Sequence, residues 1–345
     1  MKMSSVAPEE KIEFLKTLVE IYSPSGKEGE VARFIVESFE SFGVEAYLDE
    51  VGNAVAVKRG KGPLVLLAGH MDTVPGYIPV RIEDNLLWGR GSVDAKGPLA
   101  AFFFATVESD ANVIFAGLVE EELYSKGARN LEVPRPDYII IGEPSGVDGV
   151  TIGYKGSLTV RFTASVEKVH GSFGVDAAET LINRWLEIKS RFSEGFSALS
   201  GRIVEFHAYE RDFDFYAEML VNLRTPPGYE PDIGGEILDF VPAYEVDRRS
   251  GLVRAFVRAI RGCNMRPKLK KKSGTADMNI LAPRFGVDAV AYGPGNSRLD
   301  HTPHEHIHLD EYLKAVDVLK GALDELAKGW VGETQKVPEK VLSRG

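Results

Sequence analysis

The first 150 residues alternate amphipathic segments with short, continuously apolar runs. Residues 8–22 and 27–42 repeat apolar positions every three to four residues, which predicts two helices, with Ser25 capping the second. Residues 97–107 are apolar on all sides, which predicts a buried helix. The pattern is typical of an α/β unit in which helices cover a sheet.

The apolar runs between these helices predict buried strands. They are short and unbroken, as expected for strands covered on both faces. They occupy residues 54–58, 64–68, 113–119 and 138–141. Three of the runs are followed closely by an acidic or histidine residue: His70, the Glu120-Glu121-Glu122 triplet and Glu143. Open α/β sheets place their active sites at the carboxyl ends of strands, so these side chains are expected to share one site.

The middle of the chain has a different pattern. Residues 157–165 alternate apolar and polar positions, which predicts a half-exposed strand. The further predicted elements are a helix at 177–191, strands at 202–209 and 218–223, a helix at 231–240 and a short strand at 244–246. This β-α-β-β-α-β order predicts an inserted α+β, ferredoxin-like domain at 152–247.

The α/β pattern resumes after the insert and closes with a helix at about residues 310–328. We therefore expect a fold of the α/β class. Residues 1–151 and 248–345 form one domain around a mostly parallel sheet, and residues 152–247 form the second domain.

Composition narrows the possible functions. The chain has 345 residues and a net charge of −10, which argues against nucleic-acid binding. It has no apolar run of the ~18 residues that a membrane span needs, and its polar, acidic start lacks the features of a signal peptide. The single cysteine, Cys263, fits a reducing cytoplasm and excludes an intrachain disulfide.

One local cluster departs from the acidic average. Lys268, Lys270, Lys271 and Lys272 lie within five residues of one another. Such a run is commonly a solvated face, and the alternative is a docking patch for an acidic partner.

The spacing of His70 and Asp72 favours metal binding. Residues i and i+2 of an extended chain point to the same side, so Asp72 can accept a hydrogen bond from the distal nitrogen of His70 and fix its tautomer. The structural alternative is a loop histidine beside a helix-starting aspartate.

Further acidic side chains complete a candidate metal site. Asp94 lies between glycine-rich turns, where it could instead cap a helix that begins near Lys96. The three carboxylates of 120–122 repel one another after a buried strand, and cations would relieve that repulsion. A surface loop is the alternative for Glu143. Together these residues predict metal-assisted hydrolysis, in which one ion activates water and another polarises a carbonyl.

A histidine-rich segment follows near the C-terminus. His301, His304, His306 and His308 are four of the seven histidines in the chain. The spacing alone does not decide which of them binds metal, and an incidental surface cluster is the alternative.

These motifs, in this order, resemble the M20 metallopeptidase family over about residues 8–328. The similarity is carried by Gly-His-Met-Asp-Thr-Val-Pro at 69–75, Gly-Arg-Gly-Ser-Val-Asp-Ala-Lys-Gly-Pro at 89–98, the glutamate triplet with Gly127, and Gly-Glu-Pro at 142–144. The Asp-His-Thr-Pro-His-Glu run at 300–305 resembles the C-terminal motif of the family and selects His301.

The resemblance implies a role for each residue. Asp94 would bridge two divalent ions, Zn²⁺ or Co²⁺. His70 and Glu143 would bind one ion, and Glu122 and His301 the other. Glu121 would be the general acid and base, and Asp72 would orient His70.

The resemblance also implies roles for the insert and the loop after it. The insert would be a lid that dimerises the protein, and its His170, in Val-His-Gly-Ser, would stabilise the oxyanion. Arg224, Gly274 and Thr275 would bind the substrate.

Within the family, the chain is most similar to the branch that releases lysine or ornithine from a small acidic amino-group carrier protein. The lysine run at 268–272 would then steer that carrier. The alternatives are an N-acetyl-ornithine or N-acetyl-lysine deacetylase, a general dipeptidase, or a catalytically inactive metal-binding interaction module. The presence of Glu121 argues against the last of these.

Overall fold

The computed structural model describes residues 5–168 and 176–328. These residues divide into two compact units. Unit 1 comprises residues up to 152, 246–270 and 280 onward, and unit 2 comprises residues 153–245 and 271–279. Within the described ranges, no helix is long and apolar enough to cross a membrane.

The expected α/β class is confirmed by the central sheet of unit 1. Its strand order is β1-β2-β6-β3-β7-β15-β8-β13, and β14 pairs with β8. The central strands β6, β3, β7 and β15 run parallel to one another, while β2 and β8 flank them as antiparallel neighbours. The strands are β1 (Glu45–Leu48), β2 (Ala54–Lys58), β3 (Lys61–His70), β6 (Ala111–Leu118), β7 (Tyr138–Gly142), β8 (Gly149–Tyr154), β13 (Tyr244–Glu245), β14 (Lys268–Lys272) and β15 (Asp288–Tyr292).

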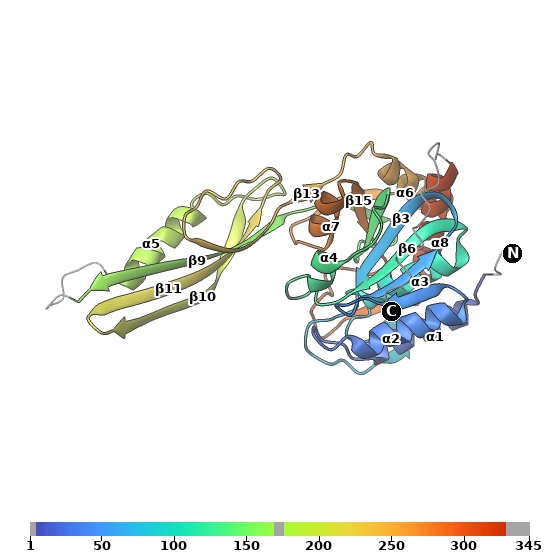
Figure 1. The fold of residues 1–345 in the computed structure, drawn as a ribbon, viewed down its shortest axis with the longest axis horizontal. Helices are drawn as coiled ribbons and strands as arrows, with labels where there is room; N and C mark the ends of the chain where they lie inside the picture. Colours follow the sequence, from blue (N-terminus) through green and yellow to red (C-terminus); the bar gives the residue numbers. More distant parts are fainter. Residues whose placement is uncertain (1–4, 169–175, 329–345) are drawn as a thin grey trace. The chain divides into compact units, whose positions relative to one another are not determined.

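Helices cover this sheet, as Figure 1 shows. They are α1 (Pro8–Glu20), α2 (Gly29–Ser41), α3 (Lys96–Glu108), α4 (Lys126–Asn130), α6 (Gly251–Gly262), α7 (Met278–Phe285) and α8 (Leu309–Lys328). The predicted buried helix is α3, whose residues from Lys96 to Val107 are all buried. The ring of Phe39 in α2 contacts the rings of Phe103 in α3 and Phe115 in β6. This aromatic cluster packs two helices against the sheet.

A small three-stranded sheet is added to unit 1. It has the order β16-β5-β4 and consists of β4 (Arg81–Glu83), β5 (Leu86–Trp88) and β16 (His306–His308). This pairing ties the segment after His301 to the segment before Asp94, two parts of the chain about 200 residues apart.

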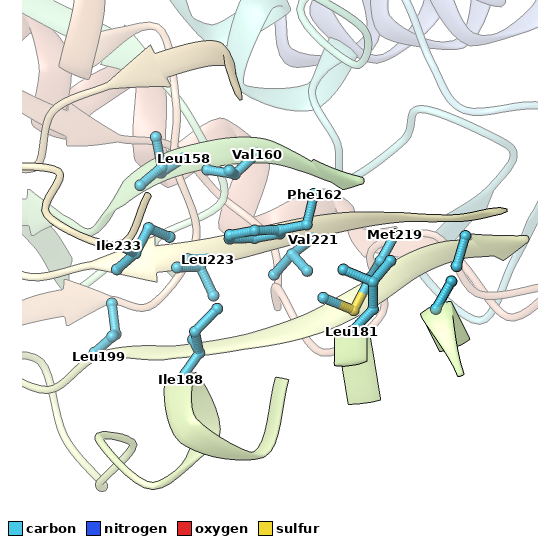
Figure 2. Close-up of a cluster of buried hydrophobic side chains, with 12 residues drawn as sticks. Leu158, Val160, Phe162, Leu181, Ile188, Leu199, Met219, Val221, Leu223 and Ile233 are labelled. Carbon is cyan, nitrogen blue, oxygen red and sulfur yellow. The ribbon is translucent and has the colours of Figure 1, made fainter. Parts of the chain in front are cut away.

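Unit 2 is a four-stranded antiparallel sheet with the order β10-β11-β9-β12 and one helix, α5 (Ala177–Lys189). Its strands are β9 (Gly156–Glu167), β10 (Ser200–Arg211), β11 (Asp214–Thr225) and β12 (Glu236–Val241). Leu158 and Val160 of β9, Val221 of β11, and Leu181 and Ile188 of α5 form its core (Figure 2). Alternating burial along β9 and β11 explains the alternation seen in the sequence.

The helix expected at 231–240 is wrong. Residues Glu236–Val241 form strand β12, which pairs with β9. Gly234 and Gly235 both have positive φ and precede this strand. Two such glycines oppose a helix start, and pairing with an open edge of β9 satisfies the backbone instead. The described part of the insert therefore contains one helix, whereas the expected ferredoxin-like order contains two.

The cap expected at Ser25 is also wrong. The residue before α2 is Glu28, and no side chain caps this helix. The Ser25 hydroxyl donates instead to Oδ2 of Asp72, 2.7 Å away.

Candidate metal centre

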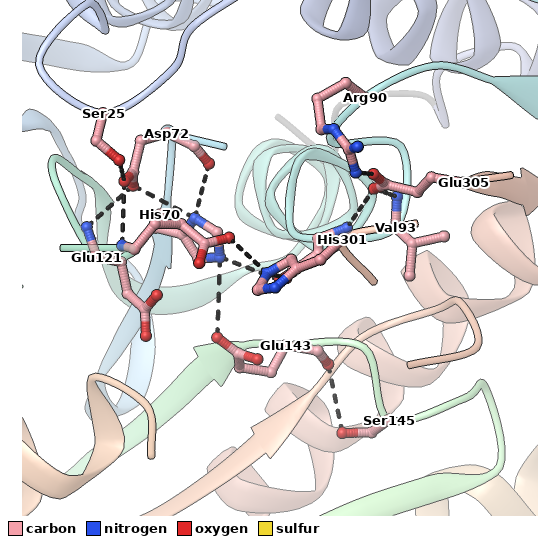
Figure 3. Close-up of polar contacts among 12 residues, drawn as sticks. Ser25, His70, Asp72, Arg90, Val93, Glu121, Glu143, Ser145, His301 and Glu305 are labelled. Atoms are coloured by element: carbon pink, nitrogen blue, oxygen red, sulfur yellow. Dashed lines mark hydrogen bonds and ion pairs between the residues drawn. The ribbon is translucent and has the colours of Figure 1, made fainter. Parts of the chain in front are cut away.

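The candidate site lies in unit 1, at the carboxyl ends of parallel strands. His70 is the last residue of β3, the glutamate triplet follows β6, and Glu143 follows β7. Asp94 precedes α3, and His301 lies between β15 and β16. Figure 3 shows the side chains of His70, Glu143 and His301 converging. The structure thus brings together all five residues expected to bind metal.

Asp94 lies between the two histidines. Its Oδ1 is 3.3 Å from Nε2 of His70, and its Oδ2 is 3.1 Å from Nε2 of His301. Each carboxylate oxygen therefore faces a different imidazole. This arrangement is what a carboxylate bridging two ions requires. Asp94 does not cap α3, the alternative that the sequence left open. The residue before this helix is Ala95, and no side chain caps it.

Each of the remaining two carboxylates lies close to one of the two histidines. Oε1 of Glu143 lies 3.9 Å from Nε2 of His70, and Oε1 of Glu122 lies 3.0 Å from Nε2 of His301. Ligand atoms of His70, Asp94 and Glu122 also lie within 4.8 Å of one another. Imidazole nitrogen and carboxylate oxygen suit a borderline divalent ion, so the side chains present fit a metal centre.

The imidazole of His70 is held in place at Nδ1, the ring nitrogen on the opposite side from Asp94. Its Nδ1 is 2.9 Å from the backbone oxygen of Asp72 and 3.4 Å from Oδ1 of the same residue. The sequence predicts only the carboxylate contact, and the backbone oxygen is nearer. Both contacts favour a proton on Nδ1, which leaves Nε2, facing Asp94 and Glu143, available to bind a metal ion.

Asp72 also organises the glutamate triplet. Its Oδ1 accepts a hydrogen bond from the backbone N–H of Glu121 at 3.0 Å, and its Oδ2 accepts one from that of Glu122 at 3.1 Å. Ser25 donates to the same carboxylate. Asp72 is fully buried. It therefore positions Glu121 and Glu122 as well as His70, a wider role than its expected one.

Glu305 is a supporting residue without an assigned role in the sequence analysis. Its Oε1 accepts hydrogen bonds from the backbone N–H groups of Val93 and Asp94, at 2.9 and 3.0 Å. Its Oε2 pairs with Arg90 at 2.7 Å, and both side chains are buried. This carboxylate holds the turn that carries Asp94 against the segment that carries His301. The signal available in the sequence was an acidic residue four positions after His301, the histidine that the family motif selects.

The pKa values of the histidines reflect this acidic surrounding. Hydrogen bonds to Asp94 and Glu122 raise the pKa of His301 to about 10. Burial opposes the charged form of His70, yet hydrogen bonds to Asp72 and Asp94 outweigh it and raise its pKa well above the usual value. The carboxylates thus attract positive charge to both Nε2 atoms, where a proton or a metal ion can supply it.

Exposure differs across the cluster. The His70 side chain is 2% exposed, whereas that of His301 is 51% exposed. The centre is therefore closed at His70 and open to solvent at His301. Glu120 and His301 have φ values of +54° and +60° beside it. Non-glycine residues seldom adopt such a conformation, and they concentrate at functional sites.

Other expected site residues lie in unit 2. The guanidinium of Arg224, on β11, donates to the hydroxyl of Thr275 at 2.8 Å, and that hydroxyl donates to the backbone oxygen of Lys155. Gly274 lies in the same loop, where an added Cβ would meet open space. The position of His170 falls outside the described residues.

The expected docking lysines lie in strand β14, and each of the four contacts another group. Lys268 pairs with Asp148 at 2.7 Å and Lys271 with Glu245 at 2.6 Å. Lys270 donates to the backbone oxygen of Ser145 and is half-buried. The Lys272 ammonium lies over the ring of Tyr154. The run is thus less positive than the sequence suggests.

The chain was compared with known proteins. Residues 66–325 match the profile of peptidase family M20/M25/M40. A Thermococcus kodakarensis protein, provisionally named a LysW-lysine/LysW-ornithine hydrolase, is 78% identical over 321 residues, which cover 93% of each chain. The LysW-lysine hydrolase of Deinococcus radiodurans is 38% identical and covers 92% of this chain and 97% of its own.

A solved structure has the same fold at low identity. The aminopeptidase PepT of Bacillus cereus has a TM-score of 0.76 at 19% identity, over 94% of this chain and 100% of its own. The resemblance to the M20 metallopeptidases is therefore confirmed. The chain belongs to peptidase family M20/M25/M40 and is a metal-dependent amide hydrolase.

Proposed function

We propose that this enzyme hydrolyses the amide bond between a carrier-protein glutamate and lysine or ornithine, and so releases the free amino acid. The main support for this reaction is the position of Asp94 between His70 and His301, because each of its carboxylate oxygens faces a different imidazole. The choice of substrate is supported by the LysW hydrolase names of relatives that match nearly the whole chain.

His70, Glu143, Asp94, Glu122 and His301 would hold two divalent ions, with Asp94 between them. Their nitrogen and oxygen donors suit Zn²⁺ or Co²⁺. Such ions, when bound, activate water and polarise the scissile carbonyl. Asp72 keeps the His70 tautomer fixed and holds the backbone of the glutamate triplet in place.

Glu121 moves the proton. Its backbone is anchored to Asp72, and its charge is near enough to contribute to the raised pKa of His70. We assign it to take a proton from the attacking water and to deliver it to the leaving amine. The substrate is bound by Arg224, Gly274 and Thr275 in unit 2, and His170 stabilises the oxyanion.

We further propose a cytoplasmic homodimer formed through unit 2, which acts as a lid. Strand β10 is an edge of the four-stranded sheet, and Ile182 and Leu186 of α5 are 46% and 55% exposed. An open sheet edge beside exposed apolar side chains is a surface that a second copy can cover. The single cysteine, Cys263, fits a reducing compartment.

The decisive experiment compares substrates. Purified enzyme with Zn²⁺ or Co²⁺ is assayed on the lysine and ornithine conjugates of the carrier, on N-acetyl-ornithine, on N-acetyl-lysine and on simple dipeptides. We expect release from a carrier conjugate at a kcat/KM at least 100-fold above that for the free acetylated amino acids. A preference for an acetylated amino acid would overturn the assignment of the substrate.

A further inference from the structure

A short loop of unit 1, residues 119–127, carries Glu121 and Glu122 and links β6 to the first turn of α4. Its two ends meet, because the backbone N–H of Gly127 donates to the backbone oxygen of Val119 at 2.9 Å. Two site residues therefore lie on backbone that has left the sheet, in a loop whose ends are joined.

The side chain of Asn53 also joins these two ends. Asn53 immediately precedes β2, whose first residue pairs with Gly117 near the end of β6. Its Oδ1 accepts a hydrogen bond from the backbone N–H of Val119 at 3.1 Å, and its Nδ2 donates to the backbone oxygen of Gly127 at 3.2 Å. Asn53 is fully buried. One side chain thus spans the base of the loop.

Asp49 fixes the orientation of this amide. Its Oδ2 accepts a hydrogen bond from Nδ2 of Asn53 at 2.8 Å, and its Oδ1 accepts one from the backbone N–H of Asn53 at 2.8 Å. Nδ2 therefore uses both of its N–H groups while Oδ1 faces a donor. A rotated amide would place Nδ2 against the N–H of Val119, so only one orientation satisfies every contact.

The base of the loop is packed as closely as it is hydrogen-bonded. A Cβ added to Gly127 would lie 2.4 Å from Oδ1 of Asn53 and 2.5 Å from the backbone nitrogen of Val119. No side chain fits there without moving one of these groups. This contact gives a physical reason for the glycine that follows the glutamate triplet in the sequence motif.

The backbone of the triplet is held by side chains as well. The N–H groups of residues 119–122 donate in turn to Asn53, to Oε1 of Glu28 at 3.1 Å, and twice to Asp72. Figure 3 shows Asp72 beside Glu121. Glu28 is 4% exposed. Four consecutive N–H groups with buried side-chain acceptors indicate a loop whose position is set by the fold around it.

We propose that Asn53 is a positioning residue for amide hydrolysis. By joining the ends of the 119–127 loop, it keeps the carboxylate of Glu121 where that group can take and return a proton. A bound ion would hold Glu122 in place, whereas Glu121 binds no ion and depends on its backbone. The inference rests on the proposed function, because it deepens the role assigned to Glu121.

The first test is Asn53→Ala, which removes the side chain at the base of the loop. Asn112→Ala is the matched control, because Asn112 is also buried but lies near the start of β6, the end away from the site. We expect kcat on the best amide substrate to fall roughly 10- to 100-fold in Asn53→Ala, since small displacements of a catalytic group are costly. KM, metal content and the kcat of the control should stay near their wild-type values. An unchanged kcat in folded Asn53→Ala overturns the proposal.

A double-mutant cycle separates positioning of Glu121 from a general structural role. In the Glu121→Gln background, the group that Asn53 positions no longer moves a proton. We expect Asn53→Ala to lower kcat by less than about twofold there, because the two residues act as one unit. An equal fractional loss of kcat in both backgrounds refutes action through Glu121.

Hydrogen exchange tests the loop without any substrate. Metal-free protein is labelled in heavy water, and the exchange of residues 119–127 is followed by mass spectrometry, with β15 as the internal reference. We expect the loop to exchange at least about tenfold faster in Asn53→Ala than in the wild type or Asn112→Ala, because local opening becomes easier. This result supports the role of Asn53 in holding the loop even if no carrier conjugate is hydrolysed. Unchanged exchange refutes that role and leaves the hydrolase assignment intact.

A milder variant keeps the test decisive if Asn53→Ala does not fold. Asp49 is only partly buried, and Asp49→Ala leaves the Asn53 side chain present but without the group that orients it. We expect changes of kcat and exchange in the same direction and of smaller size. Wild-type kcat and wild-type exchange in folded Asp49→Ala contradict the proposal.

Discussion

At the residue scale, the centre depends on carboxylates that have two functions each. Asp94 faces two histidines, and Asp72 accepts hydrogen bonds from Ser25, Glu121 and Glu122 while it contacts His70. Removing one such carboxylate therefore disturbs several groups at once. Effects within the cluster should be strongly non-additive.

The clearest test at this scale is Glu121→Gln. The amide keeps the size of the side chain but cannot accept and return a proton. We expect kcat to fall by roughly 100- to 10,000-fold, with KM and metal content nearly unchanged. Steady-state kinetics and metal analysis measure both. Loss of metal in this variant would instead make Glu121 a ligand.

Asp72→Ala tests the wider role of that side chain. We expect lower metal occupancy and a kcat loss of at least 10-fold, because outer partners of ligating histidines typically contribute 10- to 100-fold. Ser25→Ala removes only one donor to the same carboxylate and serves as the mild control. Similar losses in the two variants would contradict an organising role for Asp72.

Metal affinity should depend on pH through His301. Its pKa in the acidic cluster is raised to about 10 from 6.5. His301 is therefore protonated at neutral pH when no cation is bound, and a metal ion must displace that proton. We expect proton release on binding near pH 7 and affinity that falls as the pH is lowered. Calorimetry in buffers of different ionisation enthalpy measures the released protons, and their absence at pH 7–8 would refute the raised pKa.

At the element scale, the strands of unit 1 could be predicted well and part of unit 2 could not. Continuous apolar runs identified β3, β6 and β7, because a strand covered on both faces leaves no other pattern. The helix predicted at residues 231–240 overlaps Glu236–Val241, which form strand β12. Its strand state depends on pairing with β9, a contact between residues about 80 apart that local periodicity does not contain.

The same limit applies to the candidate site. Its ligands follow from strand ends and the family resemblance, whereas Glu305, Arg90 and Ser25 act through contacts that only the fold creates. Ser25 precedes a helical pattern in the sequence, and that position predicts a helix cap. Its hydroxyl instead meets Asp72, 47 residues later. Local sequence describes which groups are available, and the tertiary fold decides where each one bonds.

The glycines before β12 provide a stability test. Gly235 has φ +81°, and an added Cβ would lie 2.7 Å from Val160 and 2.8 Å from Phe162. Gly228 has φ +71° with nothing within 4 Å. We expect Gly228→Ala to cost about 1 kcal/mol for its left-handed backbone, and Gly235→Ala to cost roughly 1–3 kcal/mol more from overpacking. Urea unfolding followed by circular dichroism compares them, and equal costs would contradict the packing around β12.

At the scale of the whole molecule, the metal centre ties distant parts of unit 1 together. Its proposed ligands include residues that follow three strands of the sheet, and His301 lies in a segment about 200 residues after Asp94. Bound ions therefore stabilise the folded state over the unfolded chain. Because the net charge of the protein is −10, divalent cations also reduce repulsion within it.

Chelation should therefore lower stability as well as activity. We expect complete loss of hydrolysis, and a loss of about 4 kcal/mol if the free metal had been present at about 1,000 times its Kd. Scanning calorimetry with and without chelator measures the shift, and re-addition of Zn²⁺ or Co²⁺ should restore it. Amide hydrolysis that persists after chelation would refute the metal-dependent mechanism.

The buried contact of Glu305 with the Asp94 turn also sets an order of events during synthesis. The ribosome releases the chain from the N-terminus, so His70, Asp94, Glu122 and Glu143 emerge long before His301 and Glu305. Until then the Asp94 turn lacks the acceptor for two of its backbone N–H groups and Arg90 lacks its acidic partner. A nascent chain of that length therefore presents four of the five expected metal-binding residues and lacks His301. The complete set of expected ligands, and with it hydrolytic activity, arises only after synthesis has passed residue 305.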